Sequence, residues 1–212
     1  SVRDANANSL GKMEEVYLLF EEIKPNVKFI GSGSILPSSG GTGIHFEAVN
    51  LRAVDVKITK IFSNNILQFL QENDLNGQNE LARVGKRVLS KTINLGITNP
   101  ADFRIKKRFT LDIASLIKAE PGAIYRVKLS FNKSHSAFVC NGSSNNSNIE
   151  METIQKESEE NEYGYYYDYD YAYYNEEDYD WQQSDNPCNP AFYSDYKISA
   201  SKNILASDLG LT

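Results

Sequence analysis

The side chains best suited to chemistry in this chain are crowded between its only two cysteines, Cys140 and Cys188. This segment holds thirteen Asp or Glu residues, nine of the 13 tyrosines and one basic residue, Lys156. A pair of carboxylates can hydrolyse a glycosidic bond, provided that a cleft holds the two groups at a fixed separation. A polar, acidic segment with few apolar residues is not expected to build such a cleft. The acidic residues therefore do not predict a hydrolase.

Patterns for metal binding and for nucleophilic catalysis are incomplete. Residues 168–172 (DYDYA) begin like a calcium loop, but Ala172 occupies the third ligand position and no Glu stands at the twelfth. Two cysteines so far apart cannot form a structural zinc site alone, and the only histidines are His45 and His135. The sequence places no carboxylate beside His135 and its neighbouring serines, and we expect His45 to point into solvent from a strand. We predict no catalytic residue, no metal and no cofactor.

Charge divides the chain into two parts, about −12 between the cysteines and about +6 in the remainder. The acidic segment would repel phosphate, and the basic residues lack the interleaved aromatic residues of a nucleic-acid surface. These basic residues are Arg83, Lys86, Arg87, Lys106, Lys107 and Arg108. No apolar run approaches the ~18 residues that would span a bilayer. We predict no nucleic-acid partner and no membrane-spanning segment.

Alternation of apolar and polar residues indicates that short antiparallel strands position these groups. The clearest case is the face shared by Tyr125, Val127 and Leu129. A short helix ending at Leu70 is expected, capped by residues 63–65 (SNN). Strands are expected over residues 27–31, 44–48, 54–58, 89–95, 109–113 and 125–131. Short strands at this spacing, separated by turn signals, are typical of an all-β sandwich.

Several separated blocks carry a more specific signal. They are residues 46–56 (FEAVNLRAVDV), 64–70 (NNILQFL), 80–85 (ELARVG) and 118–127 (KAEPGAIYRV). In this order they resemble the N-terminal macroglobulin-type domain of bacterial alpha-2-macroglobulin family proteins, particularly a Bacteroidetes-like branch. The resemblance covers most of residues 23–140 and returns at Cys188. It implies a macroglobulin-type (immunoglobulin/fibronectin-like) antiparallel β-sandwich with a short helix and a long acidic, Tyr-rich insert.

The resemblance also implies a location and a role. An envelope location, periplasmic or anchored to the outer membrane through a lipid outside this chain, favours a disulfide between Cys140 and Cys188. In a cytosolic protein the same pair would fit two unrelated buried thiols. In the family, strings of such domains build a scaffold around a protease-cleaved bait segment, and many members trap the protease through a downstream thioester. This chain has no Cys-x-Glu-Gln motif.

We therefore expect a non-catalytic structural module of an endopeptidase-inhibitor scaffold. Its partners would be the neighbouring macroglobulin domains of the same chain and, through the full-length protein, target proteases. Residues 1–22 would be the tail end of a preceding immunoglobulin-like domain, and residues 23–200 the sandwich, with the insert at 141–187. Residues 201–212 would be an exit strand or linker to the next macroglobulin domain.

The tyrosines of the insert can lay their rings on a surface while their hydroxyls stay hydrated. We expect the insert to be a surface excursion that folds back over the basic side of its own domain. A partner-binding loop and a metal site remain alternatives. The proposed contact surface consists of Tyr165, Tyr167, Tyr169, Tyr171, Tyr173, Tyr174 and Trp181. The alternative function, from a different class, is a surface glycan- or protein-binding β-sandwich that uses these side chains.

Overall fold

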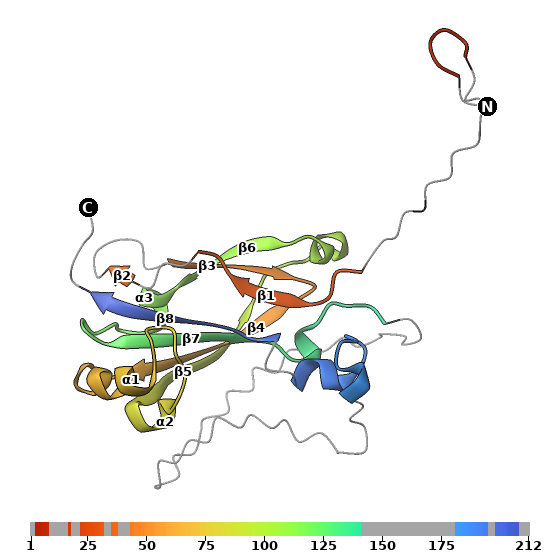
Figure 1. Ribbon diagram of the computed structural model, residues 1–212. Helices are drawn as coiled ribbons and strands as arrows, with labels where there is room; N and C mark the ends of the chain where they lie inside the picture. Colours follow the sequence, from red (N-terminus) through yellow and green to blue (C-terminus); the bar gives the residue numbers. More distant parts are fainter. Residues whose placement is uncertain are drawn as a thin grey trace.

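Two β-sheets that pack face to face form the body of the computed structural model, with short helices around them (Figure 1). This arrangement confirms the predicted all-β sandwich. The structure describes residues 3–8, 17, 22–31, 35–37, 43–140, 181–194 and 198–207.

The smaller sheet has three strands, in the spatial order β1 (Asn26–Phe29), β3 (Gly43–Val49) and β6 (Lys107–Asp112). Both pairings are antiparallel, and Phe46 of the central strand pairs with Phe29 on one side and Phe109 on the other. The alternation that predicted β3 sends every second side chain to the buried face.

The larger sheet has five strands, in the spatial order β2 (Ile35–Pro37), β8 (Ala200–Ser207), β7 (Ile124–Ser130), β4 (Ala53–Ile61) and β5 (Gly85–Asn94). Neighbouring strands are antiparallel except β2 and β8, which run parallel. The register between β4 and β5 shifts after Ile58, where Val88 is the extra residue of a β-bulge. A bulge bends its strand and increases the local twist.

Strand β8 corrects the predicted end of the sandwich. Residues 201–207 lie inside the larger sheet, between β2 and β7, and not in a segment beyond the domain. Ile204 and Ala206 are buried in the core between the sheets, whereas Leu205 packs on the opposite face. A strand that is covered on both faces has an apolar run without alternation, and β8 has such a run at residues 204–206.

Apolar side chains from both sheets fill the space between them. Val54, Val56 and Ile58 of β4 are fully buried there, opposite the buried side chains of β3. Tyr125 is the largest of the fully buried side chains, and its hydroxyl accepts a hydrogen bond from the backbone N–H of Glu120. The clearest predicted strand is therefore also the centre of the core.

Two short helices cover part of the outer face of the larger sheet. They are α1 (Ile66–Glu72), which follows the 3-10 turn η1 (Ser63–Asn65), and α2 (Leu81–Val84). Phe69 of α1 is 1% exposed and packs against Ile61, Val84 and Ile124. The predicted cap is wrong, because no side chain caps α1. Asn65 instead donates through Nδ2 to the carbonyl oxygen of Val84, which ties α1 to α2.

A buried polar network fastens the loop at residues 73–79 to the same outer face. Arg126 of β7 donates hydrogen bonds to the carbonyl oxygen of Gly77 and to Asn203 Oδ1, at 3.2 and 3.0 Å. A further bond of 2.6 Å reaches Ser201 Oγ. Asn203 Nδ2 in turn donates to the carbonyl oxygen of Gly77, at 2.9 Å. These bonds satisfy buried polar groups that would otherwise destabilise the fold.

The other short helices lie in the connections. They are η2 (Pro100–Arg104), α3 (Ile113–Leu116), η3 (Lys133–His135), η5 (Trp181–Gln183) and η6 (Pro190–Ser194). Ile113 was expected at the end of a strand but begins α3, because the Asp112 side chain accepts a hydrogen bond from the N–H of Ala114. Among the described residues, no helix is long and apolar enough to cross a membrane.

Candidate functional site

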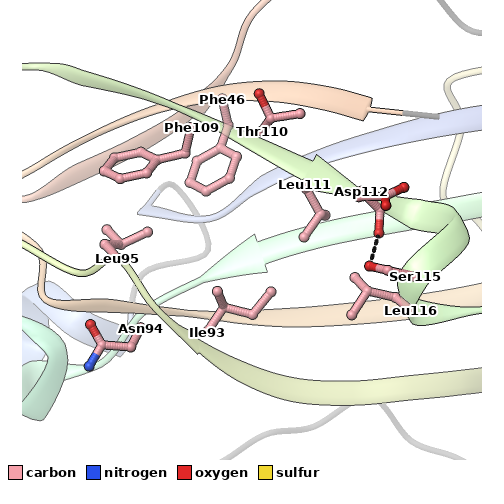
Figure 2. Close-up of a pocket in the computed structure, with 10 residues that line it drawn as sticks. All are labelled: Phe46, Ile93, Asn94, Leu95, Phe109, Thr110, Leu111, Asp112, Ser115 and Leu116. Atoms are coloured by element: carbon pink, nitrogen blue, oxygen red, sulfur yellow. Dashed lines mark hydrogen bonds between the residues drawn. The ribbon is translucent and has the colours of Figure 1, made fainter. Parts of the chain in front are cut away.

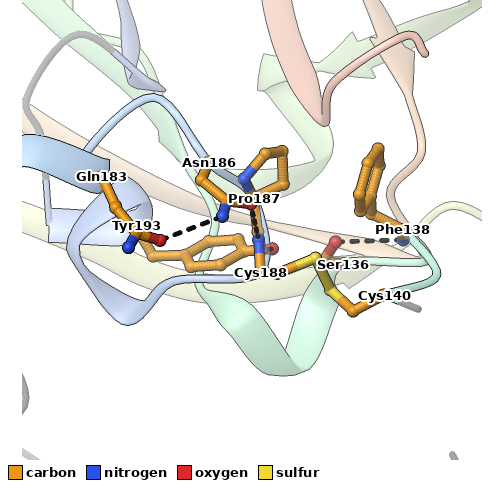
Figure 3. The surroundings of a disulfide bond; sticks show 8 residues. All are labelled: Ser136, Phe138, Cys140, Gln183, Asn186, Pro187, Cys188 and Tyr193. Atoms are coloured by element: carbon orange, nitrogen blue, oxygen red, sulfur yellow. Dashed lines mark hydrogen bonds between the residues drawn. A yellow bond between two sulfur atoms is a disulfide. The ribbon is translucent and has the colours of Figure 1, made fainter. Parts of the chain in front are cut away.

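Cys140 and Cys188 are joined by a disulfide bond, with their Cα atoms 5.7 Å apart (Figure 3). Cys140 lies beyond η3, and Cys188 lies between η5 and η6. The bond is the one that the resemblance implied. It holds both ends of the insert at one end of the sandwich.

Local hydrogen bonds stiffen the chain on the C-terminal side of the insert. The N–H of Asn186 donates to the carbonyl oxygen of Gln183, and Asn186 Oδ1 accepts from the N–H of Cys188. Asn189 Oδ1 accepts from the N–H of Ala191 at 2.8 Å, which is the arrangement of an N-cap for η6. Cys188 therefore lies between two backbone turns, each of which is held by the side chain of an asparagine.

Phe192 and Tyr193 close the core at this end, with 6% and 9% of their surface exposed. The Tyr193 ring meets Phe131 edge-on, with the ring centres 6.2 Å apart, and its hydroxyl donates to the carbonyl oxygen of Pro187 at 2.8 Å. The sequence-based expectations omit this pair. The apolar run directly after Cys188 is the signal that identifies it.

Six of the proposed contact residues lie outside the described residues: Tyr165, Tyr167, Tyr169, Tyr171, Tyr173 and Tyr174. Trp181 begins η5, at the described end of the insert. Asp185 pairs with Lys24 at 2.5 Å, so this end of the insert contacts the segment that precedes β1. The exposure of both partners makes the pair a minor contribution to stability.

Strand pairing brings His135 close to a carboxylate that its position in the sequence did not predict. His135 Nδ1 lies 3.6 Å from Asp55 Oδ2, and Asp55 accepts a hydrogen bond from Thr92 Oγ1 at 2.5 Å. Asp55 and Thr92 are paired residues of β4 and β5. Burial lowers the pKa of His135 below its usual 6.5, and the Asp55 carboxylate acts in the opposite direction.

This histidine and carboxylate do not make a nucleophilic site with the nearest serine. Ser134 Oγ donates to Asn132 Oδ1 at 2.6 Å and so belongs to the turn that forms η3. His45, as expected, is exposed on its strand, and its Nδ1 lies 3.0 Å from Thr110 Oγ1. In the described part of the chain, His135 is close to a carboxylate but not to a hydroxyl nucleophile, and His45 is close to a hydroxyl but not to a carboxylate, so neither completes a catalytic triad.

A cleft of about 310 Å³ opens between the edge strands β5 and β6 (Figure 2). We refer to it as the edge cleft. Its apolar lining comes from both sheets and from α3, and Phe46 and Phe109 stack there with ring centres 5.4 Å apart. The lining residues are Phe46, Ile93, Asn94, Leu95, Phe109, Thr110, Leu111, Asp112, Ser115 and Leu116.

The strands that border the edge cleft are the basic part of the molecule. Residues 83–112 contain eight Lys or Arg residues and two Asp residues. Lys107 pairs with Asp102 at 2.6 Å, and Arg108 pairs with Glu47 at 3.2 Å. Among the described residues, no acidic partner is found for Lys91, Arg104 and Lys106. An apolar cleft with uncompensated cations beside it is suited to an acidic, aromatic ligand.

Together the two sheets, the disulfide and the edge cleft define a β-sandwich module with a stapled insertion. No family model matches the sequence, and no curated protein is significantly similar to it.

Solved structures with a partly similar arrangement are bacterial alpha-2-macroglobulins. One is the native Escherichia coli protein spanning domains MG0-NIE-MG1, at 21% identity and a TM-score of 0.43, over 61% of this chain and 41% of that chain. Another is the native conformation of the E. coli protein, at 18% identity and a TM-score of 0.46, over 61% of this chain and 8% of that chain.

A third is Salmonella alpha-2-macroglobulin reacted with methylamine, at 17% identity and a TM-score of 0.37, over 59% of this chain and 9% of that chain. This chain thus spans less than half of the E. coli fragment and a small part of the longer proteins. At these identities and scores, the similarity assigns neither a family nor a function to it.

Proposed function

We propose that this chain is a non-catalytic, architectural module of an envelope protein of the bacterial alpha-2-macroglobulin type. The observation that supports this proposal is where the resembling blocks of sequence fall. Residues 46–56 lead from β3 into β4, residues 64–70 form most of α1, and residues 118–127 lead into β7. Each block contributes buried side chains to the sandwich or to its outer face, so the resemblance coincides with the elements that build the fold.

In this role the sandwich spaces and orients its neighbours in a protease-trapping scaffold. Its direct partners are the adjoining macroglobulin domains, and a target protease meets it only through the full-length protein. The proposal includes a periplasmic or outer-membrane-anchored location, with the lipid anchor outside this chain, and membership of a Bacteroidetes-like branch. The disulfide suits an oxidising compartment of this kind.

The proposal is tested by the complete reading frame and by an inhibition assay. The frame should encode further macroglobulin-type domains, and a downstream Cys-x-Glu-Gln motif would show that the protein traps covalently. The purified 212-residue chain should inhibit none of a panel of endopeptidases, because bait cleavage and domain rearrangement lie outside it.

Dose-dependent inhibition of several endopeptidases by this chain alone would contradict the architectural role. A short frame that ends in a carbohydrate-active domain would instead support the glycan-binding alternative. That alternative depends on the tyrosines of the insert, which lie outside the described residues.

A further inference from the structure

We propose that the edge cleft binds the chain's own acidic, tyrosine-rich segment, residues 163–180. This inference goes beyond the architectural role and does not depend on it. The segment contains nine tyrosines, six acidic residues and no basic residue. Its composition therefore matches, in both polarity and charge, the surface around the edge cleft.

The apolar floor of the cleft suits tyrosine rings. Phe46, Phe109 and Leu116 line it together with Ile93, and its volume of about 310 Å³ is at the lower end of the range for ligand sites. A space of this size takes one or a few side chains and not a folded domain. Aromatic rings prefer offset or edge-on contact with other rings, and Phe109, which stacks on the buried Phe46, is the partly exposed ring of the cleft.

The cations beside the cleft suit the carboxylates of the segment. Lys91 shares the inward side of β5 with Leu89 and Ile93, because its partner in register is the buried Val56. Lys106 lies directly before β6, three residues from Phe109. One lysine thus comes from β5 and the other from the residue directly before β6. Asp112 is the acidic residue in the lining, and its Oδ1 already accepts a hydrogen bond from the N–H of Ala114.

The length of the insert permits this binding. Residue 163 is 23 positions from Cys140, so the chain between them can span up to about 76 Å, whereas the ten residues of β5 extend over about 33 Å. Tethering through the disulfide keeps the local concentration of the segment in the millimolar range, so weak contacts are sufficient. Exposed ion pairs contribute little individually. Burial of the rings must therefore hold the segment, and charge selects the place where it binds.

Zero-length carbodiimide cross-linking of the full 212-residue chain tests the proposal, because this chemistry joins a lysine amine only to a carboxylate in contact with it. The sample is an equal mixture of unlabelled and ¹⁵N-labelled protein. We expect cross-links from Lys91 and Lys106 to the acidic residues of 168–180, within single isotopic molecules. Lys28 and Lys133, which lie on other parts of the sandwich, provide the internal control.

Hydrogen exchange with matched variants gives an independent measurement. In the wild-type chain, amides of residues 163–180 should exchange at least about tenfold more slowly than those of residues 143–148. The double variant Lys91→Glu/Lys106→Glu should remove this protection. The control variant Lys28→Glu/Lys133→Glu has the same change in net charge and should retain it.

Several results would overturn the proposal. The first is exchange of residues 163–180 as fast as that of residues 143–148 in the wild-type chain, or cross-links distributed equally over the lysines. The second is cross-linking between differently labelled molecules, which would make a second copy the occupant of the cleft. Replacement of Tyr165, Tyr167, Tyr169 and Tyr171 by Ser should release the segment without changing any residue of the sandwich, and retention of protection would also count against the proposal.

Discussion

Arg126 shows how a single side chain fastens a loop to the sheet. Its guanidinium lies under residues 73–79 and bonds to Gly77 and Asn203. The replacement Arg126→Met should lower the free energy of unfolding by about 3 kcal/mol, because it leaves buried oxygen acceptors without a donor. Urea denaturation measures this change.

The control for this prediction is Arg108→Met. The Arg108 side chain is 77% exposed and pairs with Glu47 at the surface, so its loss should cost less than about 1 kcal/mol. Equal destabilisation by the two substitutions would show that the buried network contributes nothing beyond an ordinary surface ion pair.

The disulfide bond between Cys140 and Cys188 also stabilises the fold. Cys140 and Cys188 are 48 positions apart, and the chain-entropy model assigns a loop of that length roughly 4 kcal/mol of stabilisation. The double variant Cys140→Ser/Cys188→Ser should lose a free energy of that order in urea unfolding. In the wild-type chain, alkylation followed by intact mass should find no free thiol before reduction. Two alkylated cysteines in non-reduced protein would contradict the pairing.

His135 makes stability depend on pH. Because burial lowers its pKa below 6.5, the folded chain binds fewer protons than the unfolded chain between the pKa of the folded state and pH 6.5. The stabilisation from a neutral His135 is therefore fully present above pH 6.5 and is lost as the pH falls from there through the lower pKa of the folded state. The free energy of unfolding should fall less steeply between about pH 7.5 and pH 5 in His135→Gln than in the wild-type chain.

His45→Gln is the matched control for this measurement, because His45 is exposed on β3. Urea unfolding of the wild-type chain and of both variants at each pH gives the three slopes to compare. A His135→Gln variant with an unchanged slope would show that the proximity of Asp55 compensates fully for burial.

At the scale of the elements, α1 is held by one aromatic anchor. Phe69 is 1% exposed in a small cluster on the outer face of the larger sheet, whereas Leu67 on the same helix is 80% exposed. Phe69→Ala should lower the free energy of unfolding by about 3–4 kcal/mol, and Leu67→Ala should change it by less than about 0.5 kcal/mol. Denaturation of both variants, with hydrogen exchange of α1 and α2, measures the difference. Similar values for the two would show that α1 is not anchored through Phe69.

The strands with one apolar and one polar face are the part of the fold that the sequence predicts well. Alternation located β1, β3, β4, β6 and β7, because one face of each contributes to a core and the other is polar. It could not place β8, whose apolar residues serve both faces of the sheet. The parallel pair formed by β2 and β8 joins segments far apart in the sequence, and local patterns contain no information about it.

The candidate site was predictable only in part. The disulfide followed from the resemblance and from the presence of just two cysteines. The edge cleft depends on which strands become sheet edges, and the contact between His135 and Asp55 depends on how the strands pair. Both are properties of topology, which the spacing of residues does not specify. The sequence shows that residues 83–112 are basic, but it does not show the cleft that these residues border.

At the scale of the whole molecule, separate sides of the sandwich carry separate features. The helices α1 and α2 lie at one end and the disulfide with η5 and η6 at the other, while the edge cleft opens between β5 and β6 (Figure 1). The insert leaves and returns at a single covalent junction beside Phe192 and Tyr193. A change in the length of the insert therefore does not need to alter the distance between Cys140 and Cys188.

The disulfide bond also determines the result of proteolytic cleavage within the insert. A protease that hydrolyses any peptide bond between Cys140 and Cys188 leaves two fragments that remain one molecule, because the disulfide bridges the break. Such a protein should migrate as a single band on a non-reducing gel and separate into two after reduction. Because β8 stays packed between β2 and β7, the clipped molecule should also keep the thermal unfolding transition of the intact one. After such a cleavage, the disulfide bond alone keeps the two fragments of the sandwich covalently joined.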